Sequence, residues 1–172
     1  MAQGTPELLK ALGETDPFKP YGTELFDALA RLTVSVAVEA VCLRFNSENK
    51  IEVYLAQRSP DDTAYPGEWH CPGSAMRPGE SFEDVLARLA KREFGASLVS
   101  SRFVANLNPS KVDPEARGTF LSIVYLCVLE KKEGLRGKWF LVNQLPENTV
   151  KHHRTRIIPC ALGAFVAENA SI

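Results

Sequence analysis

Three long stretches of β-branched and other apolar residues constrain the fold more than any other feature of the chain. The first runs from Leu32 to Phe45 and is nearly all apolar, which is typical of a strand covered on both faces. A polar turn at 46–50 separates it from the second stretch, 51–58, so these two are predicted to form a hairpin. The third stretch covers 119–130. We therefore expect a fold built around a β-sheet.

The clearest helical signal lies between the second and third stretches, at 81–95. Ser81 is a suitable N-cap, and Asp84 stands three residues later in the capping-box position. Apolar residues follow at i, i+3 and i+4, and Gly95 is a typical helix end. This segment predicts an amphipathic helix with one face on the sheet.

The remaining helices are expected near the two ends of the chain. They are predicted at 5–13, 23–31 and 149–168. Because helices and strands do not alternate as a βαβ repeat, the order predicts a mixed α/β sandwich (α+β), with a mixed β-sheet flanked by helices. The expected organisation is an N-terminal helical extension, 1–31, followed by one domain, 32–172.

Charge and composition narrow the class of partner. The 172 residues carry a formal net charge of −1, with 45% hydrophobic and 24% charged residues, which are ordinary values for a globular domain. A balanced charge offers no basic surface for a nucleic-acid polymer, whereas a small phosphorylated ligand remains compatible with it. The chain has no signal peptide, no apolar run of about 20 residues and no CxxC pair. We expect a cytoplasmic protein without a membrane partner.

One segment, 69–95, carries a recognisable motif. Its fixed positions are Ser74, Glu80 after five residues, Arg88 after seven more, Glu93 and Gly95. This pattern resembles the signature of the Nudix hydrolase superfamily, G-x5-E-x7-R-E-U-x-E-E-x-G-U, where U is bulky and apolar. The resemblance also includes Gln57-Arg58 and the late segment 145–162, so it covers most of 33–168.

The resemblance implies a Nudix-like fold and hydrolysis of a pyrophosphate bond with Mg²⁺ or Mn²⁺. The substrate class is a nucleoside-diphosphate-linked or other pyrophosphate compound. Helical glutamates at i, i+3 and i+4 share one face, and hard cations prefer such oxygen ligands. A bound cation polarises phosphoryl oxygen and activates water. The implied catalytic residues are Glu93, Glu80 and Arg88, with Glu93 and Glu80 as metal ligands and Arg88 orienting the carboxylates.

The motif is degenerate at the positions that matter most for metal binding. Leu89 and Arg92 stand where the family has glutamates, and Ser74 stands where it has glycine. Arg92 also brings a positive charge to the place of the cation. Any hydrolysis is therefore expected to be weak. An alternative alignment takes Arg92-Glu93 as the family's Arg-Glu pair one turn later, but it leaves Gly95 unmatched.

Other acidic and histidine residues are candidates to complete the site. Asp113 and Glu115 lie in a polar loop that could supply a carboxylate, or they are solvated loop charges. His152 and His153 begin the last predicted helix, where the pair could provide a general base, or one of them is a surface or structural residue.

The predicted substrate contacts are Arg58, Trp69 and Arg77. Two of them have a plain alternative, because Trp69 also suits core packing and Arg77, in the loop of the motif, also suits a solvated surface charge. Three functions remain open. They are a weak Nudix-type hydrolase, an inactive module that binds a nucleotide or phosphorylated metabolite, and an interaction protein. The first 31 residues are candidates for a homodimer contact or a lid.

Overall fold

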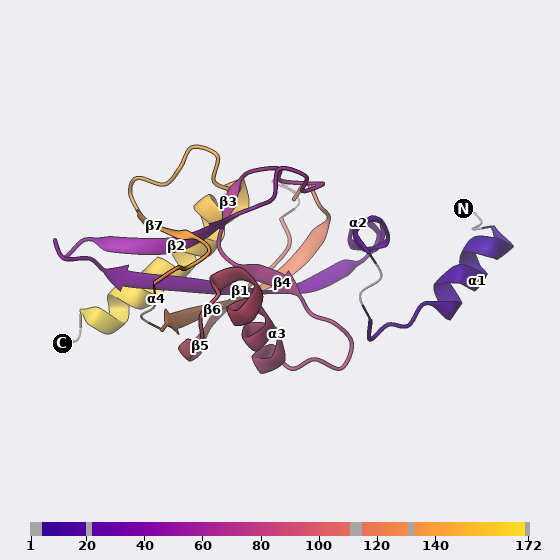
Figure 1. Ribbon diagram of the computed structural model, residues 1–172, viewed down its shortest axis with the longest axis horizontal. Coiled ribbons are helices and arrows are strands. Elements are labelled where there is room, and N and C mark those ends of the chain that lie inside the picture. The colour runs from indigo at the N-terminus through magenta and orange to yellow at the C-terminus, as the bar shows by residue number, and fades with distance from the viewer. Residues whose placement is uncertain (1–4, 20–21, 111–114, 131–132, 171–172) are drawn as a thin grey trace.

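A mixed sheet of seven strands forms the centre of the computed structural model, which describes residues 5–19, 22–110, 115–130 and 133–170 (Figure 1). The strands are β1 (Val34–Phe45), β2 (Ile51–Gln57), β3 (Trp69–His70), β4 (Gly73–Ala75), β5 (Leu98–Leu107), β6 (Thr119–Leu129) and β7 (Lys138–Leu141). Their order is β3-β2-β1-β6-β5, and β4 pairs with β1 while β7 pairs with β2. The sheet expected from the sequence is confirmed.

Helices lie on both faces and at one end of this sheet (Figure 1). They are α1 (Pro6–Glu14), α2 (Thr23–Leu32), α3 (Phe82–Leu89) and α4 (Ile158–Asn169), with π-helical turns η1 (Ala90–Phe94) and η2 (His153–Ile157). The predicted last helix is therefore divided, since η2 precedes α4 and Pro159 lies in the first turn of α4. The chain stays helical from η2 into α4, so the wider π turn lies directly before a proline that has no N–H to donate.

β1 is the longest strand and joins two parts of the sheet. From Val34 to Cys42 it runs parallel to β6, and from Leu43 to Phe45 it pairs antiparallel with β2, which confirms the predicted hairpin. Its alternate residues pack on opposite faces, with Val38 towards α3 and Val41 towards α4. Both faces of β1 are therefore covered, as its apolar composition predicts.

α3 begins with the capping box expected from the sequence. The Asp84 N–H donates to the Ser81 hydroxyl oxygen (3.2 Å), and the Ser81 N–H donates to the Asp84 carboxylate (2.9 Å). The helix then widens into η1, where the Gly95 N–H donates to the Ala90 carbonyl (3.0 Å) and Gly95 has φ 68°. Such a single π turn is common at functional sites.

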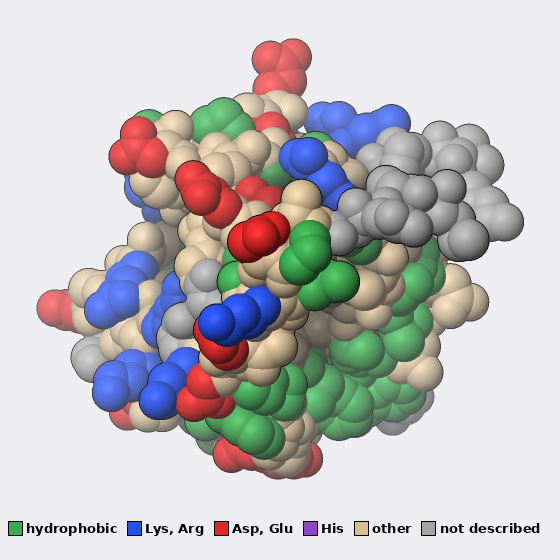
Figure 2. Space-filling view, turned by 90° about the vertical axis from the view of Figure 1, so that its right-hand side faces the viewer, with side chains coloured by type: hydrophobic (Ala, Val, Ile, Leu, Met, Phe, Trp, Pro, Cys, Tyr) green, Lys and Arg blue, Asp and Glu red, His purple; other side chains and the backbone are tan. Residues whose placement is uncertain are grey.

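The two N-terminal helices differ in how they contact the domain. α2 packs against β6, and its Phe26 ring lies 6.4 Å from the Phe120 ring. α1 has no buried residue and extends away from the sheet (Figure 1). Seen from the end at which α1 lies, hydrophobic side chains gather in the lower middle and right of the surface, and charges of both signs lie mainly to their left and above them (Figure 2). Within the described ranges, no helix is long and apolar enough to cross a bilayer.

Candidate functional site

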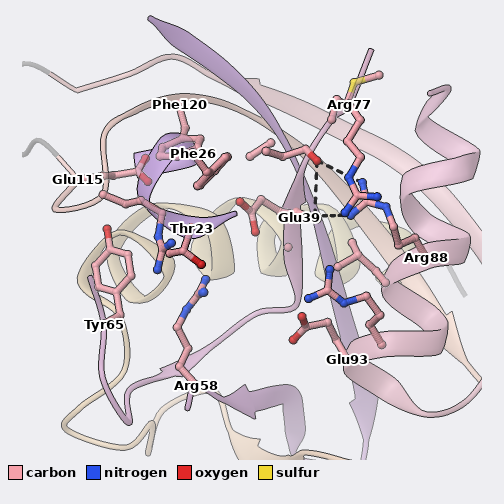
Figure 3. A pocket seen from close by; sticks show the side chains of 18 of the residues that line it. Thr23, Phe26, Glu39, Arg58, Tyr65, Arg77, Arg88, Glu93, Glu115 and Phe120 are labelled. Atoms are coloured by element: carbon pink, nitrogen blue, oxygen red, sulfur yellow. Dashed lines mark hydrogen bonds between the residues drawn. The ribbon is translucent and has the colours of Figure 1, made fainter. Parts of the chain in front are cut away.

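A cavity of about 400 Å³ opens between α2, β1, β4 and η1 (Figure 3). Its size lies in the usual range for small-molecule sites. The sequence-predicted residues Arg58, Arg77, Arg88 and Glu93 all line it. The fold thus brings together the motif helix, the loop before it and the end of the hairpin.

Glu80 and Arg88 form the tightest contact of the motif. The Arg88 Nε donates to Glu80 Oε1 (2.9 Å) and Nη2 donates to Oε2 (2.7 Å). The Arg77 N–H also donates to this carboxylate (2.8 Å). Burial raises the pKa of Glu80, but these hydrogen bonds outweigh that effect and hold it below its usual value.

Ser74, which replaces the family's glycine, is part of the same network. Its hydroxyl oxygen accepts from Arg88 Nη1 (2.6 Å), while Arg88 Nη2 also donates to the Ala75 carbonyl (3.2 Å). The side chain at position 74 therefore holds the arginine against β4.

The other two replaced positions have different surroundings. Leu89 is only 2% exposed and belongs to the core between α3 and the sheet, although it also borders the cavity. Arg92 lines the cavity beside Glu93. Glu93 Oε2 lies 3.7 Å from His70 Nε2. Burial lowers the pKa of His70 to about 3, so this imidazole is neutral and the contact is not an ion pair.

The donor set does not fit a resident divalent cation. No three carboxylate, imidazole or thiolate groups converge for metal binding in the part of the chain that the structure describes. Leu89 offers no ligand atom, and the Arg92 guanidinium opposes a cation next to Glu93. The metal roles of Glu93 and Glu80 remain predictions from the resemblance.

A buried glutamate that the motif does not include lies at the centre of the cavity wall. Glu39, on β1, is 5% exposed, and its Oε2 has no hydrogen-bond partner within the described residues. Burial, reinforced by the nearby Glu115 and only partly offset by Arg58, raises its pKa to about 8. The sequence gives one signal for it, a single acid within an otherwise apolar strand.

Glu115 also reaches the cavity, as one of the two loop acids proposed from the sequence. Burial raises its pKa to about 7, and its Oε2 lies 3.4 Å from His152 Nε2. Asp113, the other candidate, lies outside the described residues. His153 is buried at the cavity wall, and its Nδ1 accepts from the Cys71 N–H (3.2 Å). That contact supports the structural interpretation of His153.

An ion-pair network links the loop after β2 to α2. Arg58 Nη1 lies 3.2 Å from Asp62, and Arg117 contacts both Asp62 and Asp27, the latter at 3.1 Å. Burial raises the pKa of Asp62, but the N–H donors of residues 64 and 65 and the two arginines outweigh it and hold the pKa at about 2. Three aromatic rings flank this side of the cavity, those of Phe26, Tyr65 and Phe120 (Figure 3).

Trp69 is separated from the other predicted contacts. Its ring packs edge-on against Phe140, with centroids 4.9 Å apart, and it belongs to the core on the α4 side. It does not border the cavity formed by the described residues. This placement agrees with the core-packing alternative stated for Trp69.

Comparison with known proteins gives one family match. The family model for the NUDIX domain matches residues 36–159. No curated protein sequence matches the chain.

Solved structures share the fold at low identity. The NUDIX domain of Shewanella oneidensis NrtR, in complex with ADP ribose, is 20% identical, with a TM-score of 0.62 over 91% of this chain and 97% of that one. The longer NrtR chain is 19% identical, with a TM-score of 0.62, and the match covers 77% of this chain but only 63% of NrtR. A MutT/nudix family protein from Enterococcus faecalis is 20% identical, with a TM-score of 0.59 over 96% and 70% of the two chains.

Proposed function

Because the chain belongs to the NUDIX domain family, we propose that its cavity binds a nucleoside-diphosphate-linked compound, with ADP-ribose as the first to test. One observation carries this proposal. Arg92 lines the cavity in place of a family glutamate. In the motif pattern, that glutamate binds a metal ion, and the metal ion binds the anion. Here the cavity wall carries a guanidinium group instead. A guanidinium binds phosphate directly and needs no cation to do so.

The charges of the lining support a phosphorylated ligand. Among the described residues that border the cavity, the cations are Lys19, Arg58, Arg77, Arg88, Arg92 and Arg117, and the acids are Glu39, Glu93 and Glu115. No ion pair engages Arg77 or Arg92 in the described ranges, so both guanidinium groups remain available for phosphoryl oxygens. Burial keeps Glu39 mostly uncharged at neutral pH, because its pKa is about 8.

The two sides of the cavity also differ, because the arginines on the aromatic side, Arg58 and Arg117, are already paired with Asp62 and Asp27. Arg77 and Arg88 lie on one side, and the rings of Phe26 and Phe120 lie on the other (Figure 3). A diphosphate at the arginine side and a planar base at the aromatic side would match this division. The ADP-ribose complex of the NrtR NUDIX domain, which shares the fold, makes this compound the natural first ligand.

The proposal is tested by binding without metal. We would titrate the protein with α,β-methylene-ADP-ribose, which cannot be split, in the presence of EDTA. Arg92→Ala is expected to weaken the affinity at least tenfold, because a charged hydrogen bond contributes about 1.5–3 kcal/mol. Lys91→Ala is the matched control, since Lys91 is the exposed neighbour on the same turn and does not border the cavity. A wild-type protein that binds neither this compound nor other nucleoside diphosphates would contradict the proposal.

Weak hydrolysis of the same compounds, with Mg²⁺ or Mn²⁺ added, is the second candidate function. The observation in its favour is Glu93, which keeps the motif's last glutamate at the cavity with a quarter of its side chain exposed. The test is release of AMP from ADP-ribose by the wild type and by Glu93→Ala. Release that disappears in the variant supports hydrolysis, and equal release from both proteins excludes Glu93 as its catalyst.

A further inference from the structure

Glu39 borders the cavity and has a buried carboxyl oxygen without a hydrogen-bond partner in the described residues. Its side chain is almost completely buried, yet Oε2 contacts no donor or acceptor in the described part of the chain. Buried polar groups in folded proteins nearly always have a partner, because leaving one without costs about 1–3 kcal/mol. Since Glu39 borders the cavity, a bound ligand can supply that partner.

The backbone holds this carboxyl group in place. On β1, Glu39 is paired with Gly73 of β4 on one side and with Val124 of β6 on the other. A Cβ on residue 73 would overlap Glu39 Oε2 and lie only 2.7 Å from its Cδ. The space that the carboxyl group occupies therefore exists only because residue 73 is glycine.

Burial and the charges around Glu39 determine its protonation state when a ligand binds. Burial is the largest influence and raises its pKa to about 8, and Glu115 and Glu93 act in the same direction while Arg58 opposes them. The group is therefore mostly the uncharged acid at neutral pH. In that form it has one O–H donor and one carbonyl acceptor, and buried enzyme carboxyls are known to act as donors in this way.

The acidic residues near Glu39 also favour one kind of ligand group, an uncharged one. A phosphoryl dianion next to Glu39 would also approach Glu93 and Glu115, and like charges disfavour that arrangement. A hydroxyl group carries no charge and both donates and accepts, which matches a protonated carboxyl next to Glu93 and to Glu115, whose pKa is about 7. The phosphates are better served by Arg77 and Arg92, which also line the cavity.

We propose that Glu39 contacts the ligand and exchanges hydrogen bonds with a sugar hydroxyl of the bound nucleotide. This inference rests on the proposed nucleotide binding and assigns Glu39 the recognition of the sugar. It makes Glu39 a specificity-determining residue, because a diphosphate without a sugar would not use it.

The test compares two substitutions and two ligands that cannot be hydrolysed. Glu39→Gln keeps one donor and one acceptor in the same shape, whereas Glu39→Leu removes both. The ligands are α,β-methylene-ADP-ribose, which has sugar hydroxyls, and methylenediphosphonate, which has none. We expect Glu39→Leu to weaken binding of the first ligand at least tenfold and of the second less than twofold. Glu39→Gln should stay within about threefold of the wild type for both.

Each other outcome overturns a stated part of the inference. If both variants bind the sugar-containing ligand like the wild type, Glu39 does not contact it. If methylenediphosphonate loses equal affinity, the contact is to phosphate and not to a sugar. If Glu39→Gln weakens binding of the sugar-containing ligand as much as Glu39→Leu does, and the wild type binds this ligand only with Mg²⁺, Glu39 acts as a carboxylate anion and not as a hydrogen-bond donor to the sugar. If the wild type binds neither ligand, the proposed function fails and this inference with it. Thermal unfolding of each variant verifies that the domain is folded.

Discussion

The Arg88 guanidinium and the Glu80 carboxylate meet face to face, with donor–acceptor distances of 2.9 and 2.7 Å. Their side chains are only 15% and 18% exposed. Paired hydrogen bonds of this kind are both strong and geometrically specific. Because Arg88 lies on α3 and Glu80 in the preceding loop, the pair fixes the loop that forms one wall of the cavity.

Arg88→Met should therefore lower the free energy of unfolding. Removing one partner leaves a mostly buried charge without its counterion, and we expect a loss of about 2–3 kcal/mol. Urea unfolding at pH 7 would measure it. Lys91→Met, an exposed change on the next turn, is the control and should stay within about 0.5 kcal/mol of the wild type. Equal stability of Arg88→Met and the control would show that the pair does not stabilise the fold.

Glu39→Gln should change how stability depends on pH. The pKa of Glu39 is about 8 in the folded protein and near 4.5 when unfolded, so between these values the folded state holds more protons at this site. The stability that this group contributes is full below pH 4.5 and is lost as the pH rises through 8. Glutamine does not titrate. The variant should therefore gain at least about 2 kcal/mol over the wild type between pH 5 and pH 8.

Two neighbouring groups titrate in both proteins, so they largely cancel in that difference. Glu115, with a pKa of about 7, acts with the same sign as Glu39. His70, with a pKa of about 3, has the opposite sign, because its contribution is lost as the pH falls below 6.5. Urea unfolding at pH 5, 6.5 and 8 gives the comparison, with Glu24→Gln on the exposed surface of α2 as the control. A variant-to-wild-type difference that is constant with pH would refute the assignment.

Arg92→Glu should strengthen Mg²⁺ binding and weaken metal-free binding of the nucleotide. It restores the motif's glutamate next to Glu93, so calorimetry should detect stronger Mg²⁺ binding than in the wild type. Without metal, the affinity for α,β-methylene-ADP-ribose should fall at least tenfold. Lys91→Glu adds the same charge outside the cavity and should change neither property. Adding Leu89→Glu would be a poorer test, because Leu89 is buried in the core and a charge there would cost several kcal/mol.

Gly73→Ala should destabilise the protein in a way that depends on Glu39. The added methyl group would overlap the Glu39 carboxyl and force it to move. We expect a cost of about 1–3 kcal/mol in the wild type and a clearly smaller cost in the Glu39→Ala background. A double-mutant cycle by urea unfolding measures the difference. Additive effects would indicate that the two residues do not compete for the same space.

Local signals predicted most of the fold. The hairpin of 51–57 with β1 and the capping box at Ser81 follow from strand propensity and from short-range hydrogen bonding, and both are confirmed. The parallel pairing of β1 with β6 was beyond such reasoning, because strand order depends on contacts between residues far apart in the chain. The sequence also does not predict the π turn at 90–94. Its hydrogen bonds span one residue more than those of the α-helix, and the apolar periodicity of the segment does not show this difference.

The site was predictable only as far as the motif reached. Spacing placed Glu80, Arg88 and Glu93 around one loop and one helix, and these residues lie close to the cavity. The sequence did not identify Glu39 as a site residue. Its burial at the cavity depends on the pairing of β1 with β4 and β6, and these contacts are distant in the chain. Trp69 could be a ligand contact or a core residue on sequence grounds, and only the position of Phe140 distinguishes the two.

In the continuous helical segment of α3 and η1, the residues that pack on the sheet differ from those that border the cavity. This separation affects how the chemistry of such a protein can change. The capping box and the buried side chains of Val85 and Leu86 hold the helix on the sheet. Arg92, on the turn that follows, faces the cavity and contributes little to that packing. Substitutions at such a position leave the scaffold intact while they redefine what the cavity accepts. A receptor and an enzyme can therefore be separated by a few side chains on one helical turn.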